Sequence, residues 1–135
     1  MSGRPGTPDE AFVDALPKHE LHVHLEGSMP PETLLALARR HAPQDLSDLD
    51  GNPFGDLPTD LDGVRRMYEF RDFDHFIETY LRAVRTLRTT EDFRLLTATV
   101  LERLAAQGVR YAEITWTPVL HTGRGLPLAE VFEGL

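Results

Sequence analysis

The chain has 135 residues, of which 41% are hydrophobic and 27% charged, and 22 acidic against 14 basic side chains give it a formal net charge of −8. This acidic balance argues against nucleic acid and anionic membranes as partners, and no apolar run reaches the ~18 residues of a membrane span. The chain has no cysteine, which excludes disulfides and thiolate metal sites. Because the N-terminus also lacks the basic and apolar regions of a signal peptide, we expect a cytoplasmic protein.

The N-terminal segment predicts a disordered start followed by a short helix. Residues 1–6 are rich in Gly and Pro, as poorly ordered termini often are. Thr7 then has the pattern of a helix N-cap, with Pro8 at the first helical position and Glu10 completing a capping box. We therefore expect a helix that starts near Pro8 and ends before Pro17.

The next segment, Glu20 to Leu25, alternates strictly between polar and apolar residues, which predicts a strand. Its polar face carries His22 and His24, two positions apart and ~6.6 Å from each other along the strand. Two imidazoles in this arrangement can reach one zinc ion at Zn–N distances near ~2.1 Å. The motif His-x-His is weak by itself, so the sequence leaves a purely structural role for both histidines open at this point.

Downstream, the pattern predicts several helices, a second strand and one long loop. Residues 42–63 are rich in Asp, Gly and Pro, and a loop of this length in a compact domain is often functional, as a lid is. Thr89 or Thr90 is expected to cap a helix that Gly108 ends. The other expected elements are helices at 31–41, 64–68 and 73–87, a strand at 109–117 before Pro118, and the start of a helix at 127–132.

These elements indicate a piece of a larger body. Two strands alone do not make a stable sheet, and the apolar faces of about five helices need more surface to cover. The alternative is a small helical domain with one strand pair.

The segment Leu16–Ser28, with the sequence LPKHELHVHLEGS, resembles the opening signature of the adenosine deaminase family, a branch of the metal-dependent amidohydrolases. The run Pro31–Leu34 resembles the start of the family's first helix, and Gly108–Ile114 its second barrel strand. The resemblance extends from about Phe12 to His121. It implies an α/β fold, an incomplete (β/α)8 TIM barrel of the metal-dependent hydrolase type, in which residues 1–135 are the N-terminal portion of a single barrel domain of ~250 residues or more.

The resemblance further implies a zinc-dependent hydrolytic deaminase of 6-aminopurines, in which one divalent ion activates water for attack at C6. Adenosine is the first expected substrate of the complete protein. The alternatives are adenine, aminodeoxyfutalosine, or a non-catalytic module that binds metal or a purine. His22 and His24 match the family's two first-strand zinc ligands. The remaining ligands and the proton-shuttling glutamate belong to later strands, beyond Leu135, so no catalytic residue is assigned here and this piece alone is expected to be inactive.

The expected partner is a small purine nucleoside or base. Glu26 continues the polar series of the strand and stands where adenosine-selective members have an aspartate that contacts the ribose, which puts adenosine selectivity in question. It can equally be a carboxylate that caps a turn, and the aromatic spacing near residue 76 equally fits a plain core face. The other four histidines, at positions 19, 41, 75 and 121, are expected at the surface or at helix ends. The residues expected to bind substrate are His24, Glu26, Gly27, Phe73, Phe76 and Ile77.

Overall fold

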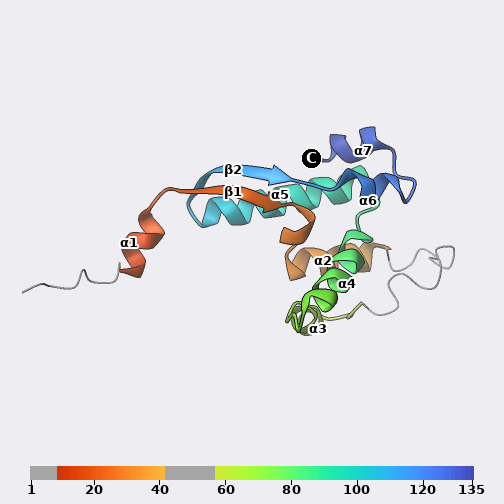
Figure 1. The fold of residues 1–135 in the computed structure, drawn as a ribbon, viewed down its shortest axis with the longest axis horizontal. Helices are drawn as coiled ribbons and strands as arrows, with labels where there is room; N and C mark the ends of the chain where they lie inside the picture. Colours follow the sequence, from red (N-terminus) through yellow and green to blue (C-terminus); the bar gives the residue numbers. More distant parts are fainter. Residues whose placement is uncertain (1–8, 42–56) are drawn as a thin grey trace, which may run out of the picture.

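The computed structural model describes residues 9–41 and 57–135. The expected disorder at residues 1–6, the expected N-cap Thr7 and most of the expected loop at 42–63 lie outside these ranges. The described chain is an α/β structure with two strands (Figure 1). In chain order the elements are α1 (Glu10–Ala15), β1 (Lys18–His24), the 3₁₀ turn η1 (Glu26–Ser28), α2 (Pro31–His41), α3 (Leu61–Met67), α4 (Phe73–Val84), α5 (Thr90–Ala106), β2 (Val109–Thr115), α6 (Pro118–Thr122) and α7 (Leu128–Glu133).

The two strands pair in parallel, so both of their carboxyl ends lie at the same edge. The register places Lys18 beside Val109 and His24 beside Thr115, with irregularities between these points. Helix α5 runs alongside the strand pair, and α6 and α7 follow the carboxyl end of β2 (Figure 1). The segments that leave β1 and β2 therefore start next to each other.

A single apolar core joins these elements. Its buried members come from the end of β1 and from the helices that follow, and they pack with partly buried neighbours such as Trp116 and Ile114. Helix α1 stands apart at one end and has no buried residue (Figure 1). The core residues are Val23, Leu25, Met29, Leu34, Leu35, Leu37, Val64, Ala83, Leu87, Phe93, Leu96, Val100 and Val131.

Several expected boundaries are confirmed. Helix α2 spans residues 31–41, as the sequence predicts, and Thr89 caps α5 in a reciprocal capping box with Asp92. Gly108 follows the end of α5 with φ of +80°. This conformation is unfavourable for any residue that has a Cβ atom, so glycine suits the position.

Other boundaries differ from the expectation. Helix α1 begins at Glu10, where the Asp9 carboxylate accepts from the N–H of Ala11, so the cap is an aspartate rather than Thr7. The long loop does not extend to residue 63, because Asp60 caps α3 by accepting from the Gly63 N–H at 2.7 Å. Pro118 opens the unexpected short helix α6 instead of simply ending the strand.

In the parts of the chain that the structure describes, no helix has both the length and the apolarity needed to cross a membrane.

Candidate functional site

Two histidines lie together at the carboxyl end of β1. The ring centroids of His22 and His24 are 4.8 Å apart, with 36° between the ring planes. Both side chains are exposed, whereas Val23 between them is buried on the opposite face, as strand alternation requires. That opposite face is covered only in part, because Leu21 is 66% exposed. Across residues 9–41 and 57–135, no third His, Asp or Glu joins the pair in a metal-binding group.

The chain turns directly after His24. Leu25 takes helical backbone angles, φ −55° and ψ −54°, and its N–H donates to Thr115 O of β2 at 2.8 Å. The polar alternation therefore ends at His24, and Glu26 does not continue it. Glu26 instead begins the turn η1 and is only 2% exposed. Its expected place on the same face as the two histidines is wrong, because the backbone leaves the extended conformation one residue earlier.

A pocket of about 440 Å³ opens beside His24. Its first wall is the end of β1 with η1, its second is the exposed side of α4, and its third is the segment that follows β2. Phe76 and Tyr80, one turn apart on α4, present stacked rings with centroids 6.2 Å apart. The lining residues are His24, Gly27, Ser28, Phe76, Tyr80, Thr117 and Leu120.

The structure brings only part of the expected substrate-binding set together. His24, Gly27 and Phe76 line this pocket. Phe73 does not line it, since its side chain is 72% exposed at the start of α4, and half-buried Ile77 is also not among the lining residues. The helical spacing that suggested these residues places them around α4 and does not reveal which side faces the end of β1.

Gly27 keeps the pocket open next to the histidine. A Cβ built on Gly27 would lie 3.5 Å from His24 Cβ and 4.0 Å from Tyr80 Cε2, both ordinary contact distances. A methyl group is therefore sterically tolerated there, but it would stand between two walls of the pocket.

Glu26 lies behind this pocket and is held by the segment after β2. Its Oε1 accepts from the Thr117 N–H at 2.8 Å and contacts His121 Nε2 at 3.0 Å. Its Oε2 is buried and has no hydrogen-bond partner among the described residues. Burial alone raises the pKa of the Glu26 carboxyl, but the hydrogen bonds from His121 and Thr117 outweigh it and leave the pKa below its usual value. Glu26 is thus a buried, ionised carboxylate.

Two histidines expected at the surface or at helix ends are buried. His121 is fully buried. The ring of Phe93 meets its imidazole edge-on with 4.8 Å between the ring centroids, and the ring of Trp116 stacks on it with 6.4 Å between the centroids. His41 does end a helix, α2, but it is 3% exposed and contacts Asp92 at 2.8 Å. Neither burial has a local signal in the sequence, because each depends on contacts with residues more than 20 positions away.

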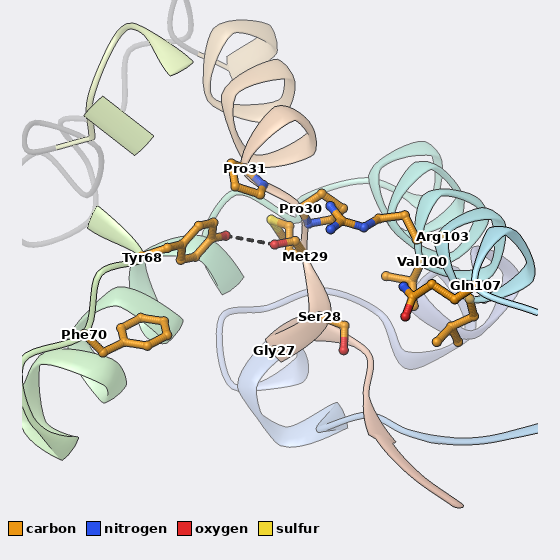
Figure 2. Close-up of a pocket in the computed structure, with 11 residues that line it drawn as sticks. Gly27, Ser28, Met29, Pro30, Pro31, Tyr68, Phe70, Val100, Arg103 and Gln107 are labelled. Atoms are coloured by element: carbon orange, nitrogen blue, oxygen red, sulfur yellow. Dashed lines mark hydrogen bonds between the residues drawn. The ribbon is translucent and has the colours of Figure 1, made fainter. Parts of the chain in front are cut away.

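A second pocket, of about 320 Å³, opens on the other side of the turn η1 (Figure 2). Val100 and Arg103 of α5 and Gln107 directly after it form one of its sides, and Tyr68 faces them across the chain between η1 and α2. The Tyr68 hydroxyl donates to Met29 O at 3.0 Å, which closes that side. Neither histidine of β1 lines this pocket, so we place the candidate site in the pocket beside His24.

Comparisons with known proteins give a consistent result. The family model described as adenosine deaminase matches residues 17–135. An aminodeoxyfutalosine deaminase of Streptomyces avermitilis is 45% identical over 116 residues, which are 86% of this chain and 29% of that protein. An adenine deaminase of Rhodospirillum rubrum is 40% identical over 128 residues, or 94% of this chain and 35% of that protein.

A solved structure agrees with these matches. The crystal structure of an adenine deaminase from Arthrobacter aurescens is similar with a TM-score of 0.73 and 38% identity, over 89% of this chain and 33% of that one. The chain therefore spans about a third of the length of the proteins that it matches.

Proposed function

The chain belongs to the adenosine deaminase family, and from this premise we propose that the complete protein is a hydrolytic deaminase of 6-aminopurines. We further propose that residues 1–135 are the N-terminal portion of one (β/α)8 barrel domain, with β1 and β2 as its first two strands. The observation that carries the proposal is the pocket beside His24 at the carboxyl edge of the strand pair, the edge where such barrels place their active sites.

His22 and His24 fit a divalent cation, with zinc as the proposed ion. Their rings share one face of β1, lie 4.8 Å apart and are exposed, so an ion can reach them from solvent. Neutral imidazole is a ligand that zinc prefers. Bound there, the ion supplies the Lewis acidity that makes water nucleophilic at neutral pH. Two protein ligands are one short of the usual catalytic set, so we infer that further ligands lie beyond residue 135.

The residues of this chain would bind and orient the purine. The stacked Phe76 and Tyr80 offer an apolar wall of the kind that flat heteroaromatic rings pack against. Burial raises the pKa of the Tyr80 hydroxyl, and the nearby charge of Glu26 raises it further. These two effects outweigh a hydrogen bond with Thr117, which lowers the pKa, so the hydroxyl stays protonated. It therefore offers the pocket an O–H group that can donate to a ring nitrogen or an oxygen of the substrate.

We propose free adenine or an adenine-bearing nucleoside such as aminodeoxyfutalosine as the substrate, in preference to adenosine. The similar proteins named above carry these two activities in their names. The structure supports the same choice, since the Glu26 carboxylate is engaged by Thr117 and His121 behind the pocket and does not line it. Both contacts use Oε1, and Oε2 is buried as well, so neither oxygen is presented to a ribose hydroxyl in the pocket.

The test is a substrate panel on the full-length protein purified with zinc. Ammonia release is measured as kcat/KM for adenine, aminodeoxyfutalosine and adenosine. We expect one of the first two to exceed adenosine by at least about tenfold, a difference of ~1.4 kcal/mol in transition-state binding. A higher kcat/KM for adenosine would overturn the substrate assignment. Purine binding without any ammonia release would instead identify the non-catalytic module.

A further inference from the structure

The three walls of the pocket beside His24 are connected by a chain of three polar side chains, of which two are buried and the third is half-buried. Glu26 belongs to the turn after β1, and His121 belongs to α6, which follows β2. Arg124 lies just after α6 and contacts His121 Nδ1 through its Nη2 at 3.0 Å. The order of contacts is Glu26, His121, Arg124, and none of the three lines the pocket itself.

Arg124 connects this chain to the wall formed by α4. Its guanidinium donates to three carbonyl oxygens at the end of α4, those of Val84 at 3.3 Å, Arg85 at 3.3 Å and Leu87 at 3.1 Å. It also donates to Leu120 O of α6 at 2.8 Å. Carbonyls at a helix end lack partners within the helix and carry partial negative charge, so a guanidinium is a suitable cap. The helix that it caps is the one that carries Phe76 and Tyr80.

The same contact bears on the tautomer of His121. A guanidinium has only donors, so the Nδ1 atom that faces Arg124 must be the acceptor and cannot carry a proton. The proton of the neutral ring then lies on Nε2, where it is donated to Glu26 Oε1. A protonated imidazolium would set an N–H of Nδ1 against the N–H groups of Arg124. Arg124 therefore orients the hydrogen bond that reaches Glu26.

We propose that His121 and Arg124 are positioning residues, which fix the spacing of the three pocket walls by holding Glu26 and the end of α4 in one hydrogen-bond chain. Such a chain is effective because Glu26 and His121 are buried and Arg124 is half-buried, so the hydrogen bonds are sheltered from solvent. His121 is fully buried, and the rings of Phe93 and Trp116 pack against its imidazole. The kinetic consequences rest on the proposed deaminase function, whereas the tautomer of His121 does not.

The first experiment reads the tautomer in the unmodified protein. Full-length protein labelled with ¹⁵N-histidine is measured by long-range ¹H–¹⁵N correlation, and the His121 signals are assigned by their loss in His121→Gln. We expect a pyridine-type nitrogen at Nδ1 and a pyrrole-type nitrogen at Nε2 at neutral pH. A proton on Nδ1, in the other neutral tautomer or in an imidazolium, would overturn the proposal, whether or not the protein deaminates purines.

The second experiment measures how substrate binding in the pocket depends on the two positioning residues. Arg124→Met keeps the length of the side chain but removes its donors, and His121→Leu removes both ring nitrogens. We expect each to raise KM for the preferred aminopurine about tenfold in folded, metal-loaded protein, because displaced walls weaken substrate binding. His121→Gln retains an N–H that can donate to Glu26 and should recover most of the loss.

The matched control is His41→Leu. It removes another buried histidine paired with a buried carboxylate, Asp92, and neither of these two residues lines the pocket. We expect it to lower the melting temperature and leave KM within about twofold of the unmodified protein. The positioning role would be refuted if KM were unchanged in Arg124→Met and His121→Leu while the melting temperature fell as in His41→Leu. The hydrogen bonds between Glu26, His121 and Arg124 would then only stabilise the fold.

Discussion

Replacing Asp92 with alanine is expected to destabilise the folded protein more than any surface substitution in α5. The Asp92 carboxylate is fully buried and joins the end of α2 to the start of α5. It accepts from Arg40 Nη1 at 2.6 Å, from His41 Nε2 at 2.8 Å, and from the backbone N–H groups of Arg88 at 3.0 Å and Thr89 at 2.9 Å. Burial raises its pKa, but these hydrogen bonds outweigh that effect and lower the pKa overall.

The magnitude follows from the donors that the truncation leaves without a partner. Two backbone N–H groups and the His41 ring each cost about 1–3 kcal/mol when buried and unpaired. Arg40 adds little, because its side chain is 46% exposed and can turn to solvent. Partial relaxation and water entry limit the total, so we expect Asp92→Ala to lose about 3–5 kcal/mol. Asp92→Asn, which retains one oxygen for the backbone donors, should lose about 1–2 kcal/mol.

The assay is equilibrium urea unfolding of the full-length protein, followed by circular dichroism. The matched control is Glu91→Ala, which removes an exposed carboxylate one residue earlier that pairs with Arg94. That control should stay within about 0.5 kcal/mol of the unmodified protein. A loss below about 1 kcal/mol for Asp92→Ala, or equal losses for both variants, would refute the role assigned to this carboxylate.

Three further outcomes follow from the structure. The folded-state pKa of Asp92 lies below the unfolded value of about 3.9. The stabilisation by its carboxylate is therefore present above that value and disappears as pH falls through the folded pKa. The stabilities of the unmodified protein and Asp92→Asn should then converge in strong acid. Burial, aided by the charge of Glu32, raises the pKa of Tyr68 to about 12, so absorbance titration should find one tyrosine that ionises well above pH 10, absent in Tyr68→Phe. Ionisation of every tyrosine near pH 10 would contradict this. Gly108→Ala should lose about 1–2 kcal/mol because φ is +80°, and a smaller loss would mean that the turn rearranges.

Elements defined by local chemistry could be predicted from the sequence. Helix α2 begins at a proline and α5 begins at a capping box, and both signals consist of neighbouring residues. The two histidines of β1 share one face because a strand alternates regardless of its surroundings. The family could also be recognised from a short segment, since residues 16–28 carry both the strand and its turn.

The remaining features of the site depend on contacts between distant segments. Glu26 lies behind the pocket for two reasons. Leu25 leaves the extended conformation of the strand, and His121, 95 positions away, forms a hydrogen bond with the Glu26 carboxylate. No pattern around His121 distinguishes it from an exposed histidine near the end of a short helix. Likewise, the periodicity of α4 marks an apolar side but does not show that Phe76, rather than Phe73, meets the end of β1. These details are set by tertiary packing.

The most direct test of the proposed metal-dependent deaminase is to measure bound zinc and ammonia release in the same samples of full-length protein. The variants are His22→Ala and His24→Ala, and the control is His19→Ala, which removes an exposed histidine from the same strand. We expect the unmodified protein and the control to retain one ion per chain and to deaminate an aminopurine, while the first two variants lose both properties together. Stoichiometric zinc and undiminished deamination in His22→Ala and His24→Ala would contradict the assignment of this site.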